Sequence, residues 1–335
     1  MSLSTITEKL LRQGHGLLAA DESLQTIHKR FAALGIEQTE ENRRAWRDLL
    51  VTTPNISEFI SGVILYEETL EQLTDENIRI PEFLTQVGIE VGIKVDQGTK
   101  PFSGHSPELI TEGLDKLNER LTRYHDLGAT FAKWRAVYMI SSTTPSDVTL
   151  IENARLLARY ALACQEAGLV PIVEPEVLMD GDHDVATCSQ VTEKVLHHVF
   201  ENLHLYHVAP ENILLKPSMI LPGKNIKLRP TPEATAHSTL NILRRCVPVA
   251  VPGICFLSGG QSETDATANL NAMKQISPNP PWKLSFSYAR ALQNSAMKAW
   301  GGHPKNKQLA QTIFSNRAKL NSLASQGLYK PSMEI

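Results

Sequence analysis

The sequence has few of the features that mark secreted, membrane or nucleic-acid-binding proteins. Its 335 residues include four cysteines, and no two of them form a CxxC pair. We therefore expect reduced thiols and a cytoplasmic location. No apolar run is long enough to span a bilayer, and residues 1–13 lack the compact apolar core of a secretory signal. The net charge is −3 with no long basic run, which argues against a nucleic-acid partner.

Linkers and cofactor motifs are also scarce. No GxGxxG motif follows a strand-like run, which disfavours a dinucleotide-binding fold. No Pro/Gly/Ser-rich linker divides the chain, so we predict a single domain over residues 1–335. This domain would begin with a short amphipathic helix at Leu3–Arg12 and end in a loose polar tail from about residue 324. The composition, 42% hydrophobic and 21% charged, is that of an ordinary globular protein.

Two segments resemble metal sites only superficially. Asp180–Asp184 reads Asp-Gly-Asp-His-Asp, but it lacks the full spacing and terminal glutamate of an EF-hand loop. Four histidines follow within one helical segment: His197, His198, His204 and His207. No two of them stand four residues apart, and no HExxH motif accompanies them. We expect a polar loop and a solvated helix face, and neither a metal nor a cofactor.

Short apolar runs recur along the chain and alternate with helical patterns. Eight of them read as strands: 16–20, 60–66, 88–95, 131–138, 169–177, 212–216, 248–257 and 282–288. Helical patterns are expected at 106–128, where Ser106-Pro107 resembles a helix start, and at 150–167, 191–206, 231–245 and 262–276. Strand then helix, repeated about eight times, predicts a parallel (β/α)8 TIM barrel. An open doubly wound sheet is the alternative.

One buried strand ends in a lysine. Residues 212–219 read Asn-Ile-Leu-Leu-Lys-Pro-Ser-Met, so three apolar residues lead into Lys216, and Pro217 ends the sheet ladder. Burial disfavours the charged form of an amine, and a neutral amine attacks carbonyls to form a Schiff base. A lysine that reaches from the strand end to the solvent is the plain alternative.

Charged residues stand at or near the ends of six predicted strands, including this one. These are Asp21, Lys94, Lys133, Arg135, Glu174, Glu176, Lys216 and Arg290. The carboxyl ends of the strands form the catalytic face of such barrels, so this set predicts an active site. Glu174 and Glu176 alternate on one strand face, and we expect their like charges to raise one pKa for acid–base work.

A small-residue turn follows the seventh predicted strand. Ser258-Gly259-Gly260 precedes a predicted helix, whose N-terminal N–H groups can bind a phosphate. Arg290 ends the eighth strand, and barrels commonly bind phosphate with these two loops. We therefore expect a phosphorylated substrate, although a plain tight turn would give the same motif.

Longer motifs resemble those of class I, Schiff-base fructose-bisphosphate aldolases. They are spread over residues 17–302 and read LLAADES, EENRR, SGVILYEETL, GIKVDQG, FAKWR, VPIVEPEVLMDGDHD, LLKPSM, FLSGGQSE, PWKLSFSYAR and KAWGG. The resemblance implies a metal-independent glycolytic enzyme, usually a homotetramer. It would reversibly cleave fructose 1,6-bisphosphate to dihydroxyacetone phosphate and glyceraldehyde 3-phosphate.

The resemblance also implies roles for individual residues. Lys216 would form the imine, Glu174 would shuttle protons, and Glu176 would support the lysine network. Asp21 would lie near the C4 hydroxyl, and Lys133 would stabilise charge on the intermediates. Arg135 and Lys94 would line the site. The phosphate contacts would be Ser258, Gly259 and Arg290 for C1, and Ser23, Lys94 and nearby Arg30 for C6.

The chain departs from the family pattern at three places. Leu24-Gln25-Thr26 replaces the usual Thr-Gly-Ser run beside the C6 phosphate, and Ala289 replaces the glycine before the last arginine. The sequence ends at Ile335 without the tyrosine of many animal members, so exchange of the C3 proton would use another group or be slower. Sedoheptulose 1,7-bisphosphate or fructose 1-phosphate as the main substrate, and a silent phosphate-binding scaffold, remain the alternative functions.

Overall fold

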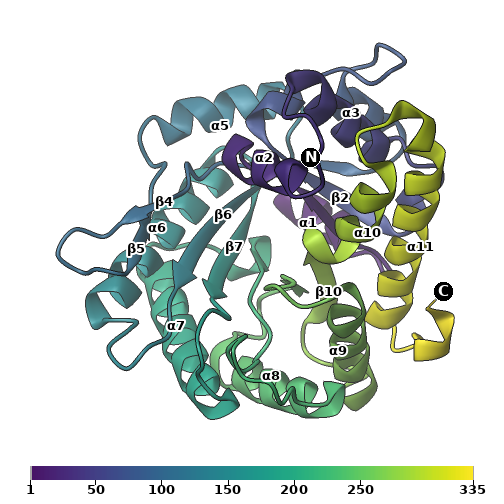
Figure 1. Cartoon of the computed structure of the whole chain (residues 1–335). Helices are drawn as coiled ribbons and strands as arrows, with labels where there is room; N and C mark the ends of the chain where they lie inside the picture. The colour runs from purple at the N-terminus through teal and green to yellow at the C-terminus, as the bar shows by residue number, and fades with distance from the viewer. Residues whose placement is uncertain (1, 335) are drawn as a thin grey trace.

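A closed barrel of eight parallel strands forms the centre of the computed structural model, which describes residues 2–334 (Figure 1). The strands follow chain order around the barrel, and β1 closes it by pairing with β10. They are β1 (Gly16–Ala20), β2 (Ile60–Leu65), β3 (Glu90–Lys94), β6 (Phe131–Tyr138), β7 (Val170–Val177), β8 (Leu214–Leu215), β9 (Gly253–Phe256) and β10 (Lys283–Tyr288). The predicted (β/α)8 barrel is confirmed, and each strand lies within an expected apolar run.

Most helices surround this barrel on its outer side, whereas the first helix adds apolar side chains to the barrel interior (Figure 1). They are α1 (Leu3–Leu10), α2 (Leu24–Ala32), α3 (Glu40–Val51), α4 (Ile80–Gln86), α5 (Leu117–Asp126), α6 (Asp147–Glu166), α7 (Val185–Leu205), α8 (Pro232–Cys246), α9 (Glu263–Ile276), α10 (Arg290–Trp300) and α11 (Lys307–Ser325). Thr231 and Ser262, the first residues of two predicted helical patterns, are N-caps that accept bonds from the first turns of α8 and α9. Among residues 2–334, no helix combines the length and apolarity needed to cross a membrane.

The predicted helix start at Ser106-Pro107 is wrong. These residues lie in the connection of an antiparallel hairpin formed by β4 (Thr99–Pro101) and β5 (Leu109–Thr111). The neighbouring Glu108 is buried, and its Oε1 accepts a hydrogen bond of 2.8 Å from the Ser146 N–H at the start of α6. This long-range bond fixes the hairpin against the barrel, and α5 begins only at Leu117.

The expected loose tail is also wrong for the residues that the structure describes. Tyr329 is buried, and its N–H donates to Asn271 Oδ1 on α9 at 3.0 Å. Arg317 Nη1 on α11 donates to Glu334 Oε1 at 2.8 Å. Residues 326–334 are therefore anchored to α9 and α11, and Ile335 lies outside the described residues.

Two apolar layers build the core. The larger one fills the space between the strands and the outer helices. The smaller one lies inside the barrel and contains Leu17, Phe131, Ile172 and Leu214 from the strands, together with Leu10 from α1. Helix α1 thus contributes apolar side chains to the barrel interior, so the barrel has a solid floor rather than a channel.

Gly92 on β3 has no room for a side chain. A β-carbon built there would lie 2.2 Å from Cε2 of Phe131, whose ring is fully buried in the inner layer. We expect Gly92→Ala to lower the free energy of unfolding by about 1–3 kcal/mol, as overpacking does, measured by urea denaturation. Adding Phe131→Leu should recover part of this loss, because it shortens the obstructing ring. An unchanged stability in Gly92→Ala would contradict this packing.

Candidate active site

The inward-facing residues change from apolar to charged toward the carboxyl ends of four strands. Successive residues of a strand point to opposite faces, so every second residue faces the barrel interior. The inward series are Ala19 then Asp21 after β1, Phe131 then Lys133 and Arg135 on β6, Ile172 then Glu174 and Glu176 on β7, and Leu214 then Lys216 after β8. The apolar members form the floor, and the charged members form a site above it.

Four of these charged residues make a continuous series of contacts. Lys216 Nζ lies 3.1 Å from Glu174 Oε1, and Lys133 Nζ lies 3.2 Å from Glu174 Oε2. Lys133 Nζ also lies 2.7 Å from Asp21 Oδ2. The four residues are at most 7% exposed. Burial of two ammonium and two carboxylate groups is tolerated because each charge has an opposite neighbour.

Asp21 and Lys133, at one end of this series, have shifted pKa values that favour their charged forms. Burial raises the pKa of Asp21, but Lys133, Lys216 and Lys94 outweigh it and lower the pKa to about 2. Burial lowers the pKa of Lys133, yet Asp21, Glu174 and Asp96 raise it well above the usual lysine value. Asp21 and Lys133 are therefore a stable ion pair at neutral pH.

The second glutamate of β7 has a different partner. Glu176 is buried and pairs with Arg135 Nε on the neighbouring β6. Burial raises the pKa of Glu176, but the charges of Arg135, Lys216 and Arg290 outweigh this and lower it. The expectation that like charges would raise a pKa in this pair is therefore wrong for Glu176, because three cations surround it.

Asp96 is a site residue that the sequence analysis missed. Its Oδ1 lies 2.6 Å from Lys94 Nζ, and its Oδ2 accepts a bond of 3.2 Å from the Arg135 N–H. Asp96 thus holds the Lys94 side chain beside β6. The GIKVD motif contains this aspartate, so the motif was the available signal.

Arg30 is a residue of α2, and its side chain contacts α10 and does not extend freely into the mouth of the barrel. Its guanidinium pairs with Glu22, and its Nη1 donates to Gln293 Oε1 at 2.8 Å. Burial lowers the pKa of Arg30, and the nearby charges of Arg47 and Arg290 lower it further, against the effect of Glu22. Glu22 also pairs with buried Arg47 at 2.7 Å. Glu22, Arg47 and Gln293 come from three separate segments, so no local sequence pattern reveals them as members of this network.

The predicted phosphate-binding turn contains two successive glycines in the left-handed region. Gly259 and Gly260 have φ angles of +56° and +85°, a left-handed pair that glycine adopts without strain. Ser258 is buried, and Arg290 Nη2 lies 3.8 Å from where a β-carbon on Gly260 would be. The turn leads into α9, whose N-cap is Ser262. The loop and the guanidinium are therefore adjacent.

Two departures from the family pattern fit the backbone. Ala289 has a φ of −101°, outside the left-handed region, so a glycine is not required there. Ser23 is the N-cap of α2, and its Oγ accepts from the Thr26 N–H at 3.4 Å. The side chain of Leu24 is 41% exposed.

Two residues of the first metal-like segment have other contacts, and three histidines of the second lie at the surface. Asp184 caps α7 by accepting from the Thr187 N–H at 2.8 Å, and Asp180 pairs with Lys224. His197, His204 and His207 are exposed at the surface.

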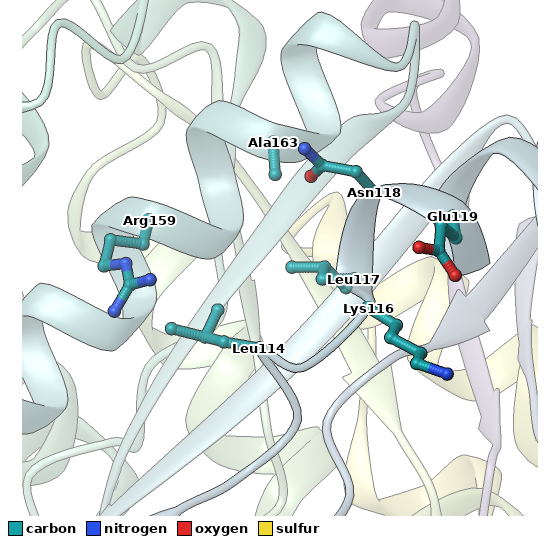
Figure 2. A pocket seen from close by; sticks show the side chains of 7 residues that line it. All are labelled: Leu114, Lys116, Leu117, Asn118, Glu119, Arg159 and Ala163. Atoms are coloured by element: carbon teal, nitrogen blue, oxygen red, sulfur yellow. The ribbon is translucent and has the colours of Figure 1, made fainter.

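A surface cavity of about 350 Å³ lies elsewhere, between α5 and α6 (Figure 2). Leu114, Leu117 and Ala163 form its apolar part, and Lys116 and Arg159 lie at its sides (Figure 2). No residue of the charged series at the barrel mouth lines it. This cavity is therefore separate from the candidate active site.

Comparisons with known proteins agree with this geometry. A family model described as fructose-bisphosphate aldolase class-I matches residues 2–335. The chain belongs to the class I fructose-bisphosphate aldolase family. It is 53% identical over 332 residues to fructose-bisphosphate aldolase B of Gallus gallus, covering 99% of this chain and 91% of that protein. It is 50% identical over 322 residues to the cytosolic fructose-bisphosphate aldolase 4 of Arabidopsis thaliana, covering 96% and 82%.

A solved aldolase has the same fold. The structure of fructose-bisphosphate aldolase from Plasmodium falciparum superposes with a TM-score of 0.96 at 46% identity, over 98% of this chain and 95% of that one. The chain is therefore a carbon–carbon lyase of the aldolase family. Its reaction is the reversible cleavage of fructose 1,6-bisphosphate through a lysine Schiff base.

Proposed function

We propose that Lys216 is the nucleophile that attacks the C2 ketone of fructose 1,6-bisphosphate. The observation that supports this most strongly is the series Lys216–Glu174–Lys133–Asp21 above the barrel floor. Lys133 has two carboxylate partners and stays protonated, whereas among residues 2–334 the Lys216 amine pairs with a single oxygen of Glu174. We therefore assign the nucleophile to Lys216 and not to Lys133.

Glu174 is positioned to move protons during imine formation. Attack by the amine gives a carbinolamine, which must lose its hydroxyl as water to form the iminium ion. Glu174 Oε1 lies 3.1 Å from Lys216 Nζ, within reach of both the amine proton and that hydroxyl. We assign Glu174 as the acid–base group of these steps. The ion pair of Glu176 with Arg135 would hold the neighbouring side chains of β7 and β6 in place.

Asp21 and Lys133 would carry the cleavage step. The C4 hydroxyl loses its proton as the C3–C4 bond breaks, glyceraldehyde 3-phosphate leaves, and the electron pair is held as an enamine on the Lys216 imine. With a pKa near 2, Asp21 is a weak base while paired with Lys133. We infer that substrate hydroxyls draw Lys133 away, so that Asp21 can accept the proton. Protonation of C3 and hydrolysis then release dihydroxyacetone phosphate.

The two phosphates would lie on opposite sides of this series. Ser258, Gly259 and Arg290 would bind the C1 phosphate through backbone N–H groups and a guanidinium. Ser23 at the N-terminus of α2 and Lys94 would bind the C6 phosphate. The resemblance implies that Arg30 lies near the C6 phosphate, but its guanidinium contacts Gln293 on α10 and lies near the charge of Arg290. We therefore propose that Arg30 adds positive charge on the C1 side instead.

Covalent trapping tests the assignment of the nucleophile. Borohydride added with dihydroxyacetone phosphate should reduce the imine to a stable secondary amine, and peptide mass mapping should place it on Lys216. An adduct on Lys133, Lys94 or another lysine would reject the assignment while leaving the aldolase reaction itself intact.

Arg290→Ala tests the phosphate assignment. An arginine–phosphate contact contributes about 1.5–3 kcal/mol, so kcat/KM should fall roughly 10–100-fold, mainly through KM. The loss should be similar for fructose 1,6-bisphosphate and fructose 1-phosphate, because both carry the C1 phosphate. Lys94→Met should instead strongly lower kcat/KM only for fructose 1,6-bisphosphate, because only this substrate of the two carries the C6 phosphate. Arg123→Ala, which removes an exposed positive charge on α5, is the control. A loss in Arg290→Ala restricted to the bisphosphate would place Arg290 at C6.

We also propose a cytoplasmic homotetramer. All four cysteines are free and buried, and an aldolase of Arabidopsis thaliana with 50% identity is described as cytosolic. The tetramer rests on the resemblance to the family. Light scattering of the purified protein would measure its mass against the 37.1 kDa of one chain.

A further inference from the structure

Three potential metal ligands meet on the outer surface of the barrel, away from the charged series. Glu193 and His197 lie on α7, and Cys246 is the last residue of α8. One oxygen of Glu193, one ring nitrogen of His197 and Cys246 Sγ all lie within 4.8 Å of one another. The sulfur is 3.7 Å from His197 Nε2. This carboxylate–imidazole–thiol group has no part in the aldolase chemistry.

The geometry points to a binding site for Zn²⁺ formed by Glu193, His197 and Cys246. Zinc binds sulfur at about 2.3 Å and imidazole nitrogen at about 2.0–2.1 Å, so two such ligands of one tetrahedral ion stand about 3.6 Å apart. The observed separation of 3.7 Å matches this value with little movement. Thiolate and imidazole favour zinc over calcium or magnesium, which prefer oxygen ligands. Three protein ligands leave the fourth position for water.

The side-chain contacts of the site allow this coordination. Glu193 Oε2 accepts from Arg245 Nη1 at 3.3 Å, and the Arg245 side chain is 63% exposed. An exposed ion pair of this kind contributes little to stability, so the carboxylate can turn toward the ion. Cys246 is 8% exposed and His197 is exposed, so the sulfur lies beneath an accessible imidazole.

A reactive cysteine–histidine pair is the competing interpretation of the same contact. Burial, reinforced by the charge of Glu193, raises the pKa of the Cys246 thiol to about 11. A thiol in this state is a poor nucleophile, because the thiolate is the reactive form. Coordination, in contrast, needs only that the ion displaces the proton.

The sequence concealed this site for two reasons. The four histidines do not stand four residues apart, but Glu193 and His197 do, and they share a helix face. The third ligand, Cys246, comes from the next helix, which no local spacing reveals. The ion would join α7 and α8, the helices before and after β8 in the chain, and so stabilise the segment that carries Lys216.

Cobalt binding tests the proposal, because Co²⁺ substitutes for zinc and a thiolate bound to it gives a charge-transfer absorption band. We expect the full-length protein to show this band and to bind one Co²⁺ per chain at this site, displaceable by Zn²⁺. Cys246→Ser should lose the band. His197→Gln and Glu193→Gln should weaken Co²⁺ binding by more than the roughly tenfold that loss of a residue supporting a ligand costs. His198→Gln, on the same helix but facing Glu201, is the matched control and should keep the band.

Thermal unfolding supplies a second readout that does not depend on aldolase activity. Zn²⁺ should raise the Tm of the wild type and of His198→Gln by a few degrees, and leave that of Cys246→Ser unchanged. Circular dichroism should show that each variant is folded. Absence of the cobalt band in the wild type, or its persistence in Cys246→Ser, would overturn the zinc site.

Discussion

Lys216→Met is expected to reduce aldol cleavage by a factor of about 10⁴ or more, the scale seen when a covalent nucleophile is removed. Methionine has nearly the length of lysine and fills the same buried space above the barrel floor. It cannot form an imine, so the electron pair of the C3–C4 bond has no acceptor. Glu174 keeps Lys133 as its partner, so the substitution does not leave an unpaired buried carboxylate.

Steady-state cleavage of fructose 1,6-bisphosphate measures this loss, and borohydride trapping measures its cause. The variant should give no reduced adduct with dihydroxyacetone phosphate, while its circular dichroism spectrum stays that of the wild type. Lys224→Met is the matched control, since Lys224 is 61% exposed and pairs with Asp180 on the surface. Turnover near the wild-type rate in Lys216→Met would reject the nucleophile assignment.

Glu174→Gln is expected to lower kcat by about 10²–10⁴, the usual range for loss of a general acid–base group. Glutamine preserves the shape of glutamate but cannot accept and return a proton. It also removes the negative charge that Lys216 and Lys133 share at 3.1 Å and 3.2 Å. Imine formation should therefore become slow, and KM should change less than kcat.

The kinetics of trapping distinguish this role from a structural one. In Glu174→Gln the rate of borohydride-reducible imine formation should fall in parallel with kcat. Glu201→Gln, an exposed glutamate on α7, controls for the change in charge. If imine formation stays fast while turnover falls, Glu174 acts after the imine, and the assignment to carbinolamine dehydration is wrong.

The sequence was most informative where one local pattern carried two kinds of information. An apolar run that ends in charge identifies both a buried strand and the side chain at its carboxyl end. Lys216 after Leu215, and Glu174 after Val173, could be placed in this way from the order of the residues alone. The alternation along a strand then puts Glu176 on the same face as Glu174.

Contacts between distant segments could not be predicted in the same way. Asp96 was visible as a residue, but its bonds to Lys94 and to the backbone of Arg135 depend on how β3 and β6 pair. Ser106-Pro107 fits a helix start locally, and only the contact between Glu108 and α6 shows that a hairpin forms instead. The polar composition of residues 326–334 likewise conceals the pairing of Arg317 with Glu334.

Asp21, which directly follows β1, contacts Lys133 on β6. In the sheet, β2 and β3 lie between β1 and β6. The bond therefore reaches across the lumen instead of running between neighbours. The other two contacts of the series, Lys216 with Glu174 and Glu174 with Lys133, join neighbouring strands and do not require a closed sheet. The contact with Asp21 does require the sheet to curve into the barrel, so the full charged series exists only in the closed fold.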